Sequence, residues 1–142
     1  MSSRPLQQLS EWSQAWLSAW NLHNITQIVS LCSPSYEGVD IAQAAPHFGQ
    51  AGMQDYANLY LRAFPDLQIT LDEMVAQENQ VVLVWNSLGT HRGILMNIPP
   101  SGHVARVRGV SILTIENGWL SRALYMWDLA GWLREIGLLP EL

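Results

Sequence analysis

The fold is decided by residues 104–127, which read VARVRGVSILTIENGWLSRALYMW. Both halves are rich in β-branched, aromatic and other apolar residues, a composition typical of strands. Between them stands Asn117-Gly118, the dipeptide that favours a two-residue hairpin turn. We therefore predict two long antiparallel strands, Val104 to Ile115 and Trp119 to about Trp127.

The pattern extends toward the N-terminus of this hairpin. Residues 81–91 form a further β-prone run, and residues 67–71 alternate apolar and polar side chains as a half-buried strand does. A short strand is expected over 36–41, a loop over 42–50, and a Pro- and Gly-rich loop over 93–102.

Helical spacing dominates the first half of the chain. Apolar residues recur every three or four positions over 6–20, and Trp12, Trp16 and Trp20 form one ridge. A short helix is expected near 25–31, another over 51–64, and a last one over 129–136 that ends at Gly137. About three helices covered by a curved antiparallel sheet predict an α+β cone with an internal pocket, built as a single domain over residues 1–142.

Composition excludes several classes of function. The 142 residues are 49% hydrophobic and 13% charged, with a net charge of −5 and no Lys/Arg run, so neither disorder nor nucleic-acid binding is expected. No stretch has the roughly 18 apolar residues of a membrane span. One cysteine, Cys32, is expected to be buried and unpaired, which fits a cytoplasmic protein.

Metal and nucleotide sites also lack support. The four histidines, at 23, 47, 91 and 103, show no HxH or HExxH spacing, and the glycines form no nucleotide-binding loop. We expect neither a metal nor a cofactor.

Asp128 is the leading candidate for chemistry. Strand alternation places it on one face with Leu120, Leu124 and Met126, and a carboxylate kept dry there would exchange protons near neutral pH. The competing interpretation is a helix N-cap, because Asp128 directly precedes the helix at 129–136.

His91 closes the strand 81–91 with the same parity as Trp85, and it is a candidate partner for Asp128 in catalysis. A histidine hydrogen-bonded at a strand end is the alternative. The remaining candidates share aromatic or apolar side chains suited to a flat hydrophobic ligand, and they are Trp16, Trp20, Tyr36, Tyr56, Trp85, Leu124 and Met126.

Four motifs resemble the SnoaL-like polyketide cyclase family: AFPDL at 63–67, GTHRG at 89–93, IPPSG at 98–102 and WDLAG at 127–131. Together with further matches at 48–52, 82–85 and 116–118 and at Gly137, they occur in the family's order from about residue 48 to 137. The resemblance implies the NTF2-like fold, a homodimer formed through the sheet, and cofactor-free chemistry. It also implies that Asp128 acts as general acid and base in an intramolecular aldol ring closure.

Three functions remain open at this point. The first is an acid–base enzyme acting on a small hydrophobic carbonyl compound, by ring closure or by related isomerase, dehydratase or hydrolase chemistry. The second is a non-catalytic protein that binds a small hydrophobic metabolite. The third is an interaction protein that uses the outer face of its sheet.

Overall fold

The computed structural model describes residues 4–140 and contains four helices and six strands in this part of the chain. The helices are α1 (Arg4–Asn21), α2 (Ile25–Ser30), α3 (Gly49–Ala63) and α4 (Leu129–Glu135). The strands are β1 (Cys32–Asp40), β2 (His47–Phe48), β3 (Gln68–Gln77), β4 (Gln80–Thr90), β5 (Val104–Glu116) and β6 (Trp119–Trp127).

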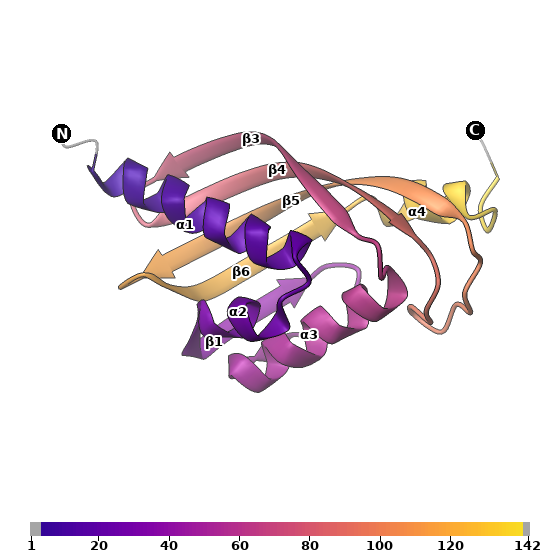
Figure 1. The fold of residues 1–142 in the computed structure, drawn as a ribbon, viewed down its shortest axis with the longest axis horizontal. Coiled ribbons are helices and arrows are strands. Elements are labelled where there is room, and N and C mark those ends of the chain that lie inside the picture. The colour runs from indigo at the N-terminus through magenta and orange to yellow at the C-terminus, as the bar shows by residue number, and fades with distance from the viewer. Residues whose placement is uncertain (1–3, 141–142) are drawn as a thin grey trace.

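All six strands form one curved sheet in the order β2-β1-β6-β5-β4-β3. The pairs are antiparallel except β1 with β6, which run parallel. Helices α1, α2 and α3 lie along one face of this sheet, and α4 lies beyond the ends of the long strands (Figure 1). The predicted α+β cone, a curved and mostly antiparallel sheet wrapped over helices, is therefore confirmed.

The hydrophobic core lies between the concave face of the sheet and the helices. Trp16, Ile28, Met53 and Leu113 are each at most 3% exposed and belong to one buried cluster. A smaller cluster centred on Trp132 of α4 closes the other end of the cone. Burial of these large side chains, at about 25 cal/mol per Å² of apolar surface, is what fixes the helices on the sheet.

Local signals set most of the element boundaries. Asn24 caps α2 by accepting a hydrogen bond from the backbone N–H of Gln27. Asn117 and Gly118 both have positive φ, as the tight turn between β5 and β6 requires, and Gly137 ends α4 with φ of 85°.

The structure differs from the sequence-based elements in β1 and in the following loop. Strand β1 begins at Cys32, four residues earlier than expected, and its register shifts between Cys32 and Glu37, where Pro34 lies. The expected loop over 42–50 contains the two-residue strand β2, which pairs with β1 through Gly38 and His47.

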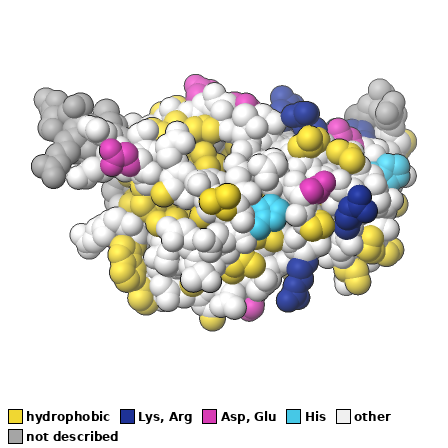
Figure 2. Space-filling view, in the orientation of Figure 1, with side chains coloured by type: hydrophobic (Ala, Val, Ile, Leu, Met, Phe, Trp, Pro, Cys, Tyr) yellow, Lys and Arg dark blue, Asp and Glu magenta, His cyan; other side chains and the backbone are white. Residues whose placement is uncertain are grey.

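Cys32 is fully buried and free, as predicted, and burial raises the pKa of its thiol to about 12. Among the described residues, no helix combines the length and apolarity needed to cross a bilayer. Figure 2 shows one face of the molecule, on which apolar side chains lie in separate patches and charged side chains are few.

Candidate functional site

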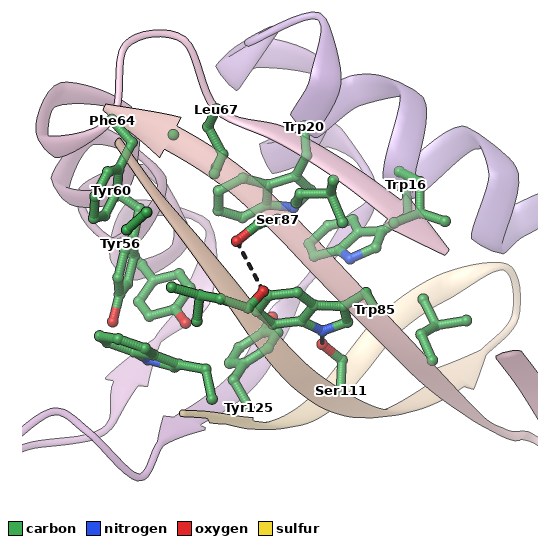
Figure 3. A pocket seen from close by; sticks show the side chains of 17 residues that line it. Trp16, Trp20, Tyr56, Tyr60, Phe64, Leu67, Trp85, Ser87, Ser111 and Tyr125 are labelled. Atoms are coloured by element: carbon green, nitrogen blue, oxygen red, sulfur yellow. Dashed lines mark hydrogen bonds between the residues drawn. The ribbon is translucent and has the colours of Figure 1, made fainter. Parts of the chain in front are cut away.

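A pocket of about 870 Å³, including the space at its mouth, lies between the concave face of the sheet and helices α1 and α3. Seventeen residues line it, from α1, α3, β3, β4, β5 and β6 and from the segment that joins α3 to β3. Most of the lining side chains are apolar or aromatic (Figure 3).

Helix α1 supplies one wall through its tryptophan ridge. Residues four apart lie on the same face of a helix, so the rings of Trp12 and Trp16 stack with centroids 5.4 Å apart. The rings of Trp16 and Trp20 meet edge to face at 6.0 Å, and Trp20 meets Tyr56 of α3 in the same way at 6.4 Å. Trp16, Trp20 and Tyr56 line the pocket, so these sequence-based candidates are placed where they were expected.

Trp85 of β4 forms part of the sheet wall. Its indole lies over Gly109 of β5, where any Cβ would fall on the ring. The indole Nε1 donates a hydrogen bond of 3.0 Å to the hydroxyl of Ser111, which also lines the pocket. The Trp85 polar atom is therefore satisfied within the wall, and its flat ring is presented to the cavity (Figure 3).

One end of the pocket has polar side chains in its wall, and behind this wall lies the buried carboxylate of Asp40, which is 1% exposed. Asp40 lies at the end of β1 and accepts hydrogen bonds from the hydroxyls of Tyr56, at 2.7 Å, and Tyr60, at 2.6 Å. The indole N–H of Trp127 donates to both carboxylate oxygens at 3.2 Å, and the backbone N–H of Ala42 donates at 2.8 Å. Tyr56, Tyr60 and Trp127 all line the pocket, so Asp40 holds the polar groups of its wall from behind.

A second hydrogen-bonded group adjoins the first. The hydroxyl of Tyr125, on β6, lies 2.9 Å from that of Tyr36, on β1, and the Tyr36 hydroxyl lies 2.8 Å from Nε2 of His47. The ring of His47 stacks on Tyr56 with centroids 4.2 Å apart. Tyr125 lines the pocket, whereas the candidate Tyr36 lies behind it, fully buried.

Burial controls the acidity of these groups. Desolvation raises the pKa of Tyr36, Tyr56, Tyr60 and Tyr125 well above the ordinary phenol value, because a phenolate would lose its hydration there. Desolvation also lowers the pKa of His47, while the negative charge of Asp40 acts in the opposite direction.

Asp128 does not line the pocket, so this part of the sequence-based prediction is wrong. Its side chain is exposed and accepts a hydrogen bond of 2.9 Å from the backbone N–H of Gly131. Asp128 is the N-cap of α4, which was the competing interpretation.

Leu124 and Met126 are likewise absent from the pocket lining. The cause is a register shift: Ile115 pairs with Leu120 and Thr114 with Arg122, so Ser121 is an extra residue in β6. Because side chains alternate along a strand, one extra residue exchanges the two faces. Tyr125 and Trp127 consequently point into the pocket, and Leu124 and Met126 point to the outer face of the sheet.

His91 is fully buried, but it does not line the pocket. Its Nδ1 accepts a hydrogen bond from the backbone N–H of Ser101 and lies 2.9 Å from the Ser101 hydroxyl. Its ring meets Trp132 of α4 edge to face with centroids 5.0 Å apart, and burial lowers the pKa of the imidazole. These contacts agree with the alternative of a histidine bonded at a strand end.

Sequence reasoning missed Asp40, His47 and Tyr125. A signal for Asp40 was present, since Tyr36, Gly38 and Asp40 alternate along the expected strand and therefore share a face. No group of three or more His, Cys, Asp or Glu side chains within residues 4–140 has the arrangement of a metal site.

A family model for SnoaL-like polyketide cyclases matches residues 10–136. The chain belongs to the SnoaL-like polyketide cyclase family. Among curated proteins, no sequence matches this SnoaL-like chain.

Solved structures agree with this assignment. The candidate hydroxylase AclR from Streptomyces galilaeus is 23% identical, with 97% of this chain and 89% of AclR covered and a TM-score of 0.83. TsrD from Streptomyces laurentii is 25% identical over 94% of this chain and 97% of TsrD, with a TM-score of 0.83. A candidate SnoaL-like polyketide cyclase from Jannaschia sp. CCS1 is 18% identical over 94% of each chain, with a TM-score of 0.85.

The fold is that of the ketosteroid isomerase and NTF2-like proteins. A Catenulispora acidiphila protein described as having a ketosteroid isomerase-like fold matches this SnoaL-like chain at 17% identity, with a TM-score of 0.78. This protein was crystallised in complex with trimethylamine, and 91% of this chain and 94% of that protein are covered.

Proposed function

We propose that this SnoaL-like protein is a cofactor-independent enzyme that moves a proton on a small hydrophobic carbonyl compound. The observation that carries the proposal is the polar end of an otherwise apolar pocket. There the hydroxyls of Tyr60 and Tyr125 belong to networks that continue to the ionisable groups Asp40 and His47. A pocket that only sequesters an apolar ligand has no need of such networks.

The chemistry requires no redox partner. A base takes a proton from the carbon next to a ligand carbonyl, and hydrogen-bond donors in the pocket stabilise the resulting enolate. In ring closure the enolate carbon bonds to a second carbonyl carbon of the same molecule, and the alkoxide formed there receives the proton. A binding protein for a hydrophobic metabolite remains the alternative.

Exchange of an α-proton for deuterium tests this without knowledge of the natural substrate. The probe is 1-tetralone, a flat bicyclic ketone, incubated with the protein in D₂O and followed by NMR. We expect wild-type protein to accelerate the exchange, and Tyr125→Phe, which keeps the ring and removes the hydroxyl, to lower the rate about 10²-fold. If the ketone quenches the tryptophan fluorescence of the protein but its exchange is not accelerated, the protein binds the ketone without catalysis.

Asp128→Asn is the matched control, and it also tests the role that the family resemblance assigns to Asp128. Asparagine caps a helix as well as aspartate does, so folding should be unaffected. Because Asp128 lies outside the pocket, we expect the exchange rate to stay at the wild-type level. A loss comparable to that of Tyr125→Phe would return the catalytic role to Asp128.

We further propose a homodimer formed through the outer face of the sheet. The register places Val75, Val82, Ile112, Leu124 and Val39 side by side across five strands. None of them belongs to either buried cluster of the described residues, and Val75 and Val39 are 53% and 44% exposed. A continuous apolar row of this kind is typical of a surface that pairs with a copy of itself.

Light scattering coupled to size-exclusion chromatography tests the dimer. Ile112→Lys places a charge at the centre of the row and should yield a monomer. Gln54→Lys introduces the same charge on the exposed side of α3 and should leave the mass unchanged. A wild-type monomer at micromolar concentration would contradict the proposal. The cytoplasmic location expected from the sequence stays a prediction.

A further inference from the structure

Three side chains connect the pocket to the half-buried histidine through two short hydrogen bonds. The oxygens of Tyr125 and Tyr36 are 2.9 Å apart, and the Tyr36 oxygen is 2.8 Å from His47 Nε2. Tyr125 lines the pocket, Tyr36 is 1% exposed, and His47 is partly open to solvent.

We propose that Tyr125, Tyr36 and His47 form a proton relay in which Tyr125 is the catalytic residue at the ligand and His47 is the terminal base. The inference rests on the proposed function, because it names the group that removes and returns the ligand proton. Tyr36 and His47 act through Tyr125 and are positioning residues.

The pKa values of the two phenols and of the imidazole make His47 the group that accepts the proton at the end of the relay. Burial raises the pKa of both phenols, so neither tyrosine holds a negative charge at neutral pH. A proton that is taken up at Tyr125 must therefore pass through both hydroxyls together to reach a group that accepts it. Neutral imidazole is such a group: burial lowers the pKa of His47 and so keeps it unprotonated and able to accept, and the nearby negative charge of Asp40 acts in the opposite direction.

The transfer balances at every atom. The ligand C–H bond breaks and leaves its electron pair on the ligand as an enolate, while Tyr125 oxygen receives the proton. The former Tyr125 proton moves to Tyr36 oxygen, and the former Tyr36 proton moves to Nε2 of His47, which becomes imidazolium. All three groups then donate toward the pocket, so Tyr125 is oriented to return a proton to the new alkoxide.

Gly38 keeps the path between Tyr36 and His47 open. Gly38 pairs with His47 across β1 and β2, and a Cβ at this position would fall on the Tyr36 hydroxyl and on His47 Nε2. Any side chain there would occupy the space of the hydrogen bond. The relay therefore requires a glycine at position 38.

The first experiment measures deuterium exchange of 1-tetralone across pH. The groups that face His47 are Tyr36 and Asp40 of β1, Tyr56 of α3 and Tyr125 of β6. Burial lowers the pKa of His47, so we expect wild-type kcat to fall only below about pH 6.5. Tyr36→Phe and His47→Gln should lower kcat at least about 10-fold with little change in KM and abolish this acid limb.

The matched control is His103→Gln, the same change at an exposed histidine, which should keep both the rate and the acid limb. In His47→Ala, added imidazole should restore part of the rate, which a purely structural role of His47 would not predict. Wild-type rates and an unchanged acid limb in Tyr36→Phe and His47→Gln would overturn the relay while leaving the enzyme function intact.

A second measurement requires no turnover and separates the relay from the proposed function. In ¹⁵N-labelled protein above pH 7, we expect the Nε2 resonance of neutral His47 to show a hydrogen bond that Tyr36→Phe and Gly38→Ala both remove. An Nε2 resonance that neither variant shifts would overturn the relay. If the resonance shifts as expected but no ketone is exchanged, the connection is supported and only the proposed function fails.

Discussion

Replacing Asp40 by asparagine tests how strongly the buried carboxylate holds the polar end of the pocket. The amide has nearly the same shape, but one of its two acceptor oxygens becomes an NH₂ group. If this group faces the hydroxyls of Tyr56 and Tyr60, both charge-assisted hydrogen bonds are lost. The remaining oxygen keeps the N–H groups of Trp127 and Ala42.

Hydrogen bonds to a charged group contribute about 1.5–3 kcal/mol each and neutral ones about 0.5–1.5 kcal/mol. Losing two of the first kind and regaining two of the second kind lowers the free energy of unfolding by about 2–3 kcal/mol. A domain of this size has about 5–15 kcal/mol of stability, so Asp40→Asn should still fold.

Urea unfolding followed by tryptophan fluorescence measures the effect. Tyr60→Phe removes one of the two phenol donors and should cost less, about 1 kcal/mol. The double variant should cost less than the sum of the two single changes, because both act on one hydrogen bond. Asp128→Asn is the control on the surface, with an expected change within about 0.5 kcal/mol.

Unfolding of Asp40→Asn at the same urea concentration as wild type, with the same slope, would contradict a stabilising role of the carboxylate. Fully additive costs of Asp40→Asn and Tyr60→Phe would show that these two groups are not bonded to each other.

Two further predictions concern packing and pH. Gly109→Ala places a methyl group on the indole of Trp85, so we expect the free energy of unfolding in urea to fall by about 1–3 kcal/mol. The displaced indole should also weaken the binding of 1-tetralone. Unchanged binding would show that Trp85 does not contact the ligand. Burial lowers the pKa of both His47 and His91, so below about pH 6.5 the unfolded chain binds protons that the folded chain does not. The contribution of these histidines to stability should therefore be complete above about pH 6.5 and fall as the pH is lowered from there. A combined His47→Gln, His91→Gln variant should show a flatter dependence of thermal stability on pH between pH 8 and 5. An unchanged dependence would exclude these two histidines as its source.

Much of the fold was predictable because its signals are local. The Asn117-Gly118 turn, the ridge of Trp12, Trp16 and Trp20, and the cap at Asn24 each act within a few residues. Such signals depend little on what packs against them, so the helices and the strands β4, β5 and β6 were predicted nearly at their true boundaries, whereas β3 extends six residues beyond the predicted 67–71, to Gln77.

The site was less predictable because it depends on strand register. The extra residue at Ser121 changes which face of β6 enters the pocket, and no turn residue or proline in the sequence marks it. The contact of His47 with Tyr36 requires the pairing of β2 with β1. Strand β2 has only two residues and no β-prone run around it, so this pairing forms only in the folded chain. Asp40, in contrast, shared its face with Tyr36 and was recognisable from alternation alone.

The uneven wall of the pocket has a consequence for the outcome of any reaction within it. Trp16 and Trp85 lie toward one side and Tyr56 and Tyr60 toward the other (Figure 3), and the carboxylate of Asp40 lies behind the two tyrosines. A guest molecule with an oxygen at one tip and hydrocarbon at the other would enter in a single direction. Regioselectivity would then be dictated by the scaffold before any bond is made or broken.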